Sequence, residues 1–69
     1  MKNDLALRRQ ERGWSQAEMG ARVGVSRQTI NAIENGRYDP SLPLAFKLAR
    51  AFGCLIEDLF DSEQGDDSC

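Results

Sequence analysis

Gly24, which separates two short helical patterns, is the feature that most constrains how this chain can fold. The sequence predicts one helix from Gln16 to Val23 and a second from Arg27 to Asn35. Because glycine has no Cβ, Gly24 can end the first helix with a positive φ and let the chain turn sharply. The two helices are therefore expected to cross at a steep angle.

Both predicted helices begin with the same start signal. Ser15 is the expected N-cap of the first helix, and Glu18 completes a capping box three residues later. Ser26 is the expected N-cap of the second helix, without the glutamate. The apolar residue before each serine should pack onto the fourth residue of its helix. These pairs are Trp14 with Met19 and Val25 with Ile30.

The spacing of small and branched residues adds to this pattern. Two helices that cross steeply need a small residue where the backbones touch, and Gly20 occupies that place. They also need branched aliphatic residues where the second helix meets the core, and Ile30 and Ile33 meet that need. A helix, a tight glycine turn and a second helix make a helix-turn-helix.

The segment SQAEMGARVGVSRQTINAIENG resembles the helix-turn-helix of the phage-repressor-like (Xre) family. The resemblance extends over the first helix and over PSLPLAFKLARAFG and IEDLF, and so covers roughly residues 3–60. It implies an all-α, compact five-helix bundle of the lambda-repressor-like DNA-binding type. Two residues depart from the family pattern: Gly20 where Ala is usual, and Arg8 where an apolar residue is usual. A glycine inside a helix costs about 1 kcal/mol relative to alanine.

The remaining helices have recognisable ends. Asn3 is the expected cap of a first helix that runs to Arg12. Ser41 should cap a fourth helix that ends at Gly53, and a short fifth helix should follow. The apolar residues assigned to the core are Leu44, Ala45, Leu48, Ala49 and Phe52 in the fourth helix, and Ile56, Leu59 and Phe60 in the fifth.

Length and charge bound the domain organisation. The 69 residues permit one domain, which we place at residues 1–60, with the helix-turn-helix at 16–35 and an acidic, disordered tail at 61–69. Residues 1–50 hold nine basic and five acidic residues, a balance of +4, whereas residues 51–69 carry −6. A basic body suits a polyanionic partner, because the local field of one face binds phosphate. The tail has the alternative interpretation of a solvated segment that aids solubility.

Several classes of function are not expected. The chain has no apolar run of about 18 residues and no leader, which predicts a cytoplasmic protein with no membrane segment. It has no His and only Cys54 and Cys69, so neither a metal site nor a disulfide framework nor a cofactor is expected. Cys54 is interpreted as a small apolar residue, with a redox-sensing thiol as the alternative. Without a nucleotide-binding loop or catalytic cluster, the chain is not expected to be an enzyme.

Arg9 and Glu34 are predicted to form an ion pair. The family resemblance implies that the arginine of the first helix pairs with the glutamate that ends the second helix of the motif. The physical argument is independent: a carboxylate near a helix C-terminus opposes the helix dipole, and a guanidinium can bind it through two hydrogen bonds. The alternative is two solvent-facing charges of little energetic value.

A helix-turn-helix places its second helix in the major groove of DNA. We therefore predict that Arg27, Gln28 and Asn31 read bases, since Arg can bind guanine and Gln or Asn can bind adenine. Ala32 offers only a methyl group. The alternatives are a phosphate contact for Arg27 and a generic polar surface for the other two.

Phosphate contacts are expected from groups that flank this helix. Gln16 lies at the N-terminus of its helix, where unpaired N–H groups favour an anion. The other candidates are Ser26, Thr29, Asn35, Arg37 and Tyr38.

The function predicted from these features is sequence-specific binding of double-stranded DNA by a transcriptional regulator that acts as a repressor. One domain reads only a few base pairs, so we expect a homodimer on a palindromic operator with half-sites about 34 Å apart. The dimer surface is either the fifth helix, with Leu55, Ile56 and Phe60, or the exposed part of Trp14. The alternative function is a protein-interaction module, such as an antitoxin or antirepressor partner, with the same fold.

Overall fold

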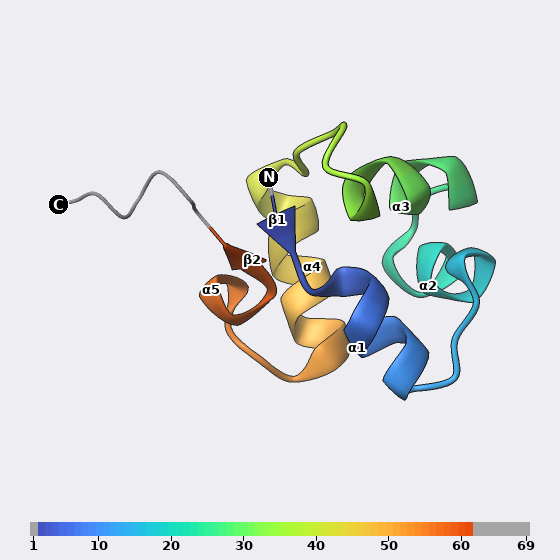
Figure 1. Cartoon of the computed structure of the whole chain (residues 1–69), viewed down its shortest axis with the longest axis horizontal. Coiled ribbons are helices and arrows are strands. Elements are labelled where there is room, and N and C mark those ends of the chain that lie inside the picture. The colour runs from blue at the N-terminus through green and yellow to red at the C-terminus, as the bar shows by residue number, and fades with distance from the viewer. Residues whose placement is uncertain (1, 62–69) are drawn as a thin grey trace, which may run out of the picture.

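The computed structural model describes residues 2–61 and has five helices, as the sequence predicts (Figure 1). The helices are α1 (Leu5–Glu11), α2 (Gln16–Val23), α3 (Arg27–Glu34), α4 (Leu42–Phe52) and α5 (Ile56–Leu59). Two strands of two residues each, β1 (Lys2–Asn3) and β2 (Phe60–Asp61), pair antiparallel and join the two ends of the described chain. The all-α class is confirmed, and the strand pair was not predicted.

The helix-turn-helix forms as expected from its capping residues. Ser15 Oγ accepts the Glu18 N–H at 3.0 Å, and the Glu18 carboxylate accepts the Ser15 N–H at 3.2 Å, which completes the capping box. Ser26 Oγ accepts the Thr29 N–H at 3.2 Å at the start of α3. Gly24 ends α2 with a φ of 81°, in the left-handed region that favours glycine. These local interactions make the sharp turn between α2 and α3.

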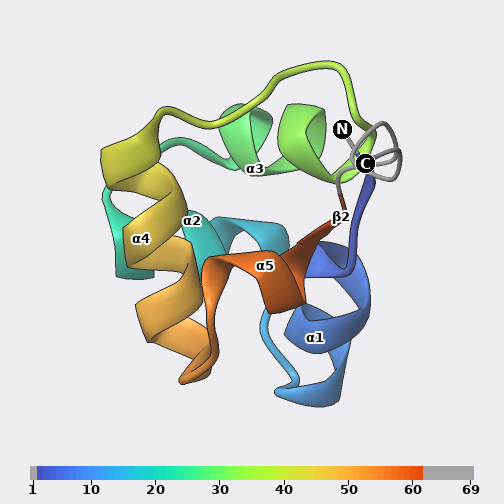
Figure 2. The ribbon, with the colours of Figure 1, turned by 90° about the vertical axis from the view of Figure 1, so that its left-hand side faces the viewer.

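All five helices contribute apolar side chains to one core. Its fully buried members are Leu5, Met19, Ile30, Ile33, Leu48 and Leu59. Figure 2 shows α4, α5 and α1 on one face of the molecule and α3 along an edge of that face. The core therefore supports α3 from one side and leaves its other side outward. Among residues 2–61, no helix has the length and apolar character needed to cross a bilayer.

The start of the first helix differs from the prediction. The helix begins at Leu5, and Asp4 takes the N-cap position without a side-chain cap. Asn3 lies in β1, yet its Oδ1 accepts the Leu5 N–H at 3.0 Å and its Nδ2 donates to the Ile33 carbonyl at 2.8 Å. The Asp4 N–H donates to the Leu59 carbonyl at 2.9 Å. These long-range bonds hold Asn3 and Asp4 outside the helix. The helix therefore starts one residue later than a cap at Asn3 predicts.

Two predicted boundaries at the other end of the chain also move. Phe60, assigned to the fifth helix, has extended backbone and pairs with Asn3. Asp61, assigned to the tail, belongs to the same strand. The rest of the predicted acidic tail, residues 62–69, lies outside the described residues.

Gly20 marks the closest approach of α2 to the segment that begins α3. A Cβ at this position would lie 2.5 Å from the Val25 carbonyl oxygen and 3.3 Å from Ser26 backbone atoms. The Val25 N–H also donates to the Gly20 carbonyl at 2.9 Å. The crossing in this chain is therefore too close for the alanine that is usual in the family.

Gly20→Ala is expected to lower stability. Crowding in a packed site typically lowers the free energy of unfolding by about 1–3 kcal/mol. The higher helix propensity of alanine offsets about 1 kcal/mol of that loss. The net loss of up to about 2 kcal/mol should appear as a lower Tm in thermal unfolding followed by circular dichroism. Ala21→Gly, at an exposed position of α2, measures the propensity term alone. A Gly20→Ala protein with a higher Tm would contradict the close crossing.

Candidate nucleic-acid interface

A partly buried ion pair connects the end of α3 to α1. Arg9 Nε donates to Glu34 Oε2 at 2.7 Å, and Arg9 Nη2 donates to Glu34 Oε1 at 3.3 Å. The side chains are only 12% and 7% exposed. The predicted pair is therefore present, in the two-bond geometry that a guanidinium makes with a carboxylate.

Two further hydrogen bonds extend this contact to the start of the helix-turn-helix. Arg9 Nη1 donates to the Trp14 carbonyl at 2.8 Å, and Gln16 Nε2 donates to Glu34 Oε1 at 2.9 Å. We call Arg9, Gln16 and Glu34 the α1–α3 junction. The junction holds the first residue of α2 against the last residue of α3, so it fixes how the two helices of the motif lie relative to α1.

Gln16 thus has an internal role that its sequence position did not predict. One hydrogen of its side-chain amide is committed to Glu34. Its backbone N–H stands at the N-terminus of α2, where the positive end of the helix dipole favours an anion. The phosphate contact predicted for Gln16 stays a prediction, and the bond to Glu34 leaves the backbone N–H and one amide hydrogen for it.

The two faces of α3 have opposite character. Ile30 and Ile33 are buried in the core, whereas Arg27 and Gln28 are exposed in the first turn of the helix. Within residues 2–61, the structure records no hydrogen bond or ion pair for the side chain of Arg27 or Gln28. Both side chains are therefore available to an external partner.

Asn31, the third predicted base reader, has hydrogen-bond partners within the chain, unlike Arg27 and Gln28. Its Oδ1 accepts from Asn35 Nδ2 at 3.2 Å and from Arg37 Nη2 at 3.3 Å. The two donors orient the Asn31 amide so that its oxygen is occupied and its NH₂ group remains a donor. An amide needs both groups to bind adenine through two hydrogen bonds. In this arrangement Asn31 offers a donor only.

The other residues predicted to contact phosphate surround α3. Ser26 Oγ caps the helix and also lies 3.1 Å from Thr29 Oγ1. Asn35, Arg37 and Tyr38 are exposed just beyond the end of α3. The structure therefore places Ser26 and Thr29 at one end of the helix and the other three at its opposite end.

Arg12 has a structural role that the sequence prediction missed. Its Nη2 donates to the Phe52 carbonyl at 2.9 Å, at the C-terminal end of α4. Its guanidinium also lies 5.5 Å from the ring centroids of Trp14 and Phe52. The excess of arginine over lysine in the first helix was the available signal, because a guanidinium can both stack on rings and donate several hydrogen bonds.

The predicted dimer surfaces need revision. Arg22 lies 4.1 Å from the Trp14 ring centroid and Phe52 packs at 5.4 Å on the same ring, which leaves Trp14 half-buried. Phe60 is buried in the core. Leu55 remains exposed and Ile56 is half-buried. Cys54 is a half-buried free thiol packed against the core, in agreement with its predicted apolar role.

With this geometry in place, comparison with known proteins gives the family. The family model described as helix-turn-helix matches residues 5–59, which is most of the chain. The chain belongs to this helix-turn-helix family. The phage-repressor-like (Xre) resemblance is confirmed, and the family is one of DNA-binding transcriptional regulators rather than enzymes.

Two relatives match this chain over nearly their whole length. An uncharacterized HTH-type transcriptional regulator of Methanocaldococcus jannaschii is 55% identical over 60 residues, which cover 87% of this chain and 91% of that protein. The uncharacterized HTH-type transcriptional regulator YgzD of Bacillus subtilis is 48% identical over 64 residues, or 93% and 97% of the two chains.

A solved structure similar to this helix-turn-helix protein shows DNA in place. The P22 c2 repressor, crystallised with a synthetic operator, superposes with a TM-score of 0.74 at 28% identity and covers 77% of this chain and 80% of its own. Antitoxin HipB of Escherichia coli is more distant, at 33% identity over 71% of this chain and 56% of its own.

Arg9→Ala is expected to destabilise this helix-turn-helix protein by about 3 kcal/mol, because it leaves the buried Glu34 carboxylate without its cation. In a domain of this size the Tm should fall by roughly 10 °C or more. Arg9→Lys keeps the charge and loses the two-bond geometry, so its Tm should lie between those of the wild type and Arg9→Ala. Arg27→Ala, at an exposed arginine, is the matched control and should leave the Tm nearly unchanged. An Arg9→Ala protein as stable as this control would show that the junction is not structural.

Proposed function

We propose that this protein is a transcriptional repressor that binds double-stranded DNA sequence-specifically through α3 in the major groove. The observation that carries the proposal is the first turn of α3, where Arg27 and Gln28 are exposed and uncommitted while Ile30 and Ile33 anchor the helix. A helix-turn-helix presents its second helix to base edges at this turn. The similarity to a repressor crystallised with its operator supports the same mode of action.

Arg27 and Gln28 would supply most of the base recognition. The guanidinium of Arg27 suits the O6 and N7 acceptors of guanine, and the amide of Gln28 suits the N6 and N7 groups of adenine. Asn31, whose oxygen accepts from Arg37 and Asn35, would donate to an acceptor on a base or a phosphate. Ala32 would contact at most a thymine methyl group.

The backbone of DNA would be held by groups at both ends of α3. Gln16, Ser26 and Thr29 lie toward the start of the motif, and Asn35, Arg37 and Tyr38 follow its end. Such contacts position a protein without reading sequence, and they make affinity fall as salt rises. Arg37 would combine both roles, since it carries a charge and also orients Asn31.

A homodimer on a palindromic operator completes the proposal. A single α3 reads only a few base pairs, and a two-fold dimer doubles the site with half-sites about one helical turn apart. The DNA partner would place the protein in the cytoplasm. The alternative of an antitoxin or antirepressor partner has support from HipB only at a distance, and the polar, uncommitted first turn of α3 favours DNA.

Selection of bound oligonucleotides from a random pool tests this function. The wild type should enrich one sequence family, and Gln28→Ala should lose preference at one position of each half-site. The expected loss of discrimination is about 1–3 kcal/mol, the value of one good base contact. Gln10→Ala, an exposed glutamine on α1, is the matched control and should enrich the wild-type sequence. No enrichment by the wild type, or an unchanged sequence with Gln28→Ala, would contradict the proposal.

A further inference from the structure

The end of α3 holds the side chain of Asn31 in one orientation. Asn31 Oδ1 accepts from Asn35 Nδ2 at 3.2 Å and from Arg37 Nη2 at 3.3 Å. A guanidinium carries donors only, so the atom of Asn31 that faces Arg37 must be the oxygen. The NH₂ group therefore points the other way, and within residues 2–61 the structure records no acceptor for it.

The backbone at the end of α3 places Arg37 where it can reach this oxygen. Gly36 has a φ of 74°, the left-handed conformation that commonly follows the last residue of a helix. The Gly36 N–H donates to the Ile33 carbonyl at 3.0 Å. The Arg37 N–H donates to the Ala32 carbonyl at 2.9 Å. These two bonds form a Schellman motif, which turns the chain back so that Arg37 contacts Asn31, six residues earlier.

The NH₂ group of Asn31 belongs to the outward face of α3. Asn31 follows Gln28 by three residues and Arg27 by four, and residues at these spacings lie on the same side of a helix. Asn31 is half-buried, whereas Arg27 and Gln28 are exposed. If this face lies in the major groove, as the proposed function requires, the NH₂ group meets the edge of a base.

The bases differ in what they offer to such a donor. Guanine presents the acceptors O6 and N7, and thymine presents the acceptor O4. Cytosine presents only its N4 amino group, which is a donor. Adenine presents the acceptor N7 beside its N6 amino group, and that amino group needs an acceptor in return. Since the oxygen of Asn31 is already occupied, adenine would gain one bond and leave its amino group unpaired.

We propose that Asn31 selects a base with a keto oxygen, guanine or thymine, and that Arg37 and Asn35 are the positioning residues that impose this choice. An unrestrained asparagine binds adenine through both of its polar groups. In this chain two donors from the end of α3 remove that option. The inference rests on the proposed function and names the class of base that α3 reads at this position.

Selection of bound oligonucleotides with Asn31→Ala identifies the base position, since this variant should lose preference at one position of each half-site. The wild type should hold guanine or thymine there. On four duplexes that differ only at this position, it should bind the keto bases roughly tenfold more tightly than adenine or cytosine. Asn31→Asp replaces the outward donor with an acceptor, so the preference should pass to adenine or cytosine.

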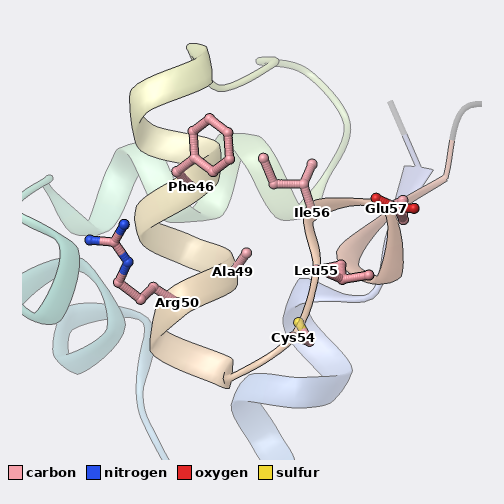
Figure 3. Close-up of a pocket in the computed structure, with 7 residues that line it drawn as sticks. All are labelled: Phe46, Ala49, Arg50, Cys54, Leu55, Ile56 and Glu57. Atoms are coloured by element: carbon pink, nitrogen blue, oxygen red, sulfur yellow. The ribbon is translucent and has the colours of Figure 1, made fainter.

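Removal of the two internal donors tests the positioning role. In the double variant Arg37→Met and Asn35→Ala, the Asn31 amide is free to rotate, so the affinity ratio of adenine to the keto bases should rise roughly tenfold. Loss of phosphate contacts lowers the affinity for all four duplexes alike, so this ratio isolates the positioning effect. Arg50→Met is the matched control and should leave the ratio unchanged, because Arg50 is exposed on α4 beside an apolar groove that contains none of these residues (Figure 3).

Three results would overturn this inference alone, in a wild type that does select a sequence. One is an Asn31→Ala protein that keeps every preference of the wild type. Another is a preference for adenine or cytosine at the position that Asn31→Ala identifies. The third is an unchanged affinity ratio in the double variant. A wild type that selects no sequence would instead overturn the proposed function, and this inference with it.

Discussion

The buried carboxylate of Glu34 is the constraint on which the rest of the structure depends. It lies at the C-terminal end of α3, where the helix dipole already places partial negative charge. Only 7% of the side chain is exposed, so water stabilises the charge little. Arg9 and Gln16 replace that water with three hydrogen bonds from α1 and α2.

The main effect of the α1–α3 junction is to fix the positions of α1, α2 and α3 relative to one another. A buried ion pair gains little net free energy once desolvation is counted, although loss of one partner is costly. What it provides is geometry, because Glu34 accepts all three bonds only when α1, the start of α2 and the end of α3 lie together. An eight-residue helix such as α3 is not stable alone, so its orientation depends on these contacts and on Ile30 and Ile33 in the core.

The placement of α3 determines which of its side chains face outward. With its apolar side buried and its last residue fixed, the first turn of α3 projects Arg27 and Gln28. At the other end, Arg37 and Asn35 set the orientation of the Asn31 amide. The Asn31 amide is therefore oriented before any partner binds, which lowers the cost of ordering this side chain, whereas no bond within residues 2–61 orders the side chains of Arg27 and Gln28.

Sequence reasoning recovered the features that local rules decide. The serine caps, the turn at Gly24 and the bounds of α2 follow from short-range patterns, and the Arg9–Glu34 pair followed from helix electrostatics together with the family pattern. It missed contacts between residues far apart in the chain, such as the strand pair, the Asn3 bond to Ile33 and the Arg12 bond to Phe52. No local pattern specifies those partners, because they depend on how the helices pack. The same limit explains why Gln16 and Asn31 have internal partners and why Phe60 is buried.

Chemical protection of bound DNA tests the central claim most directly. The claim is that α3 of this protein lies in the major groove with its first turn against base edges. Guanine N7 faces the major groove and adenine N3 faces the minor groove, and dimethyl sulfate methylates both. On an operator selected by the wild type, the protein should protect guanine N7 in two half-sites about 10 base pairs apart and leave adenine N3 reactive. Protection of adenine N3 with guanine N7 still reactive would contradict the account.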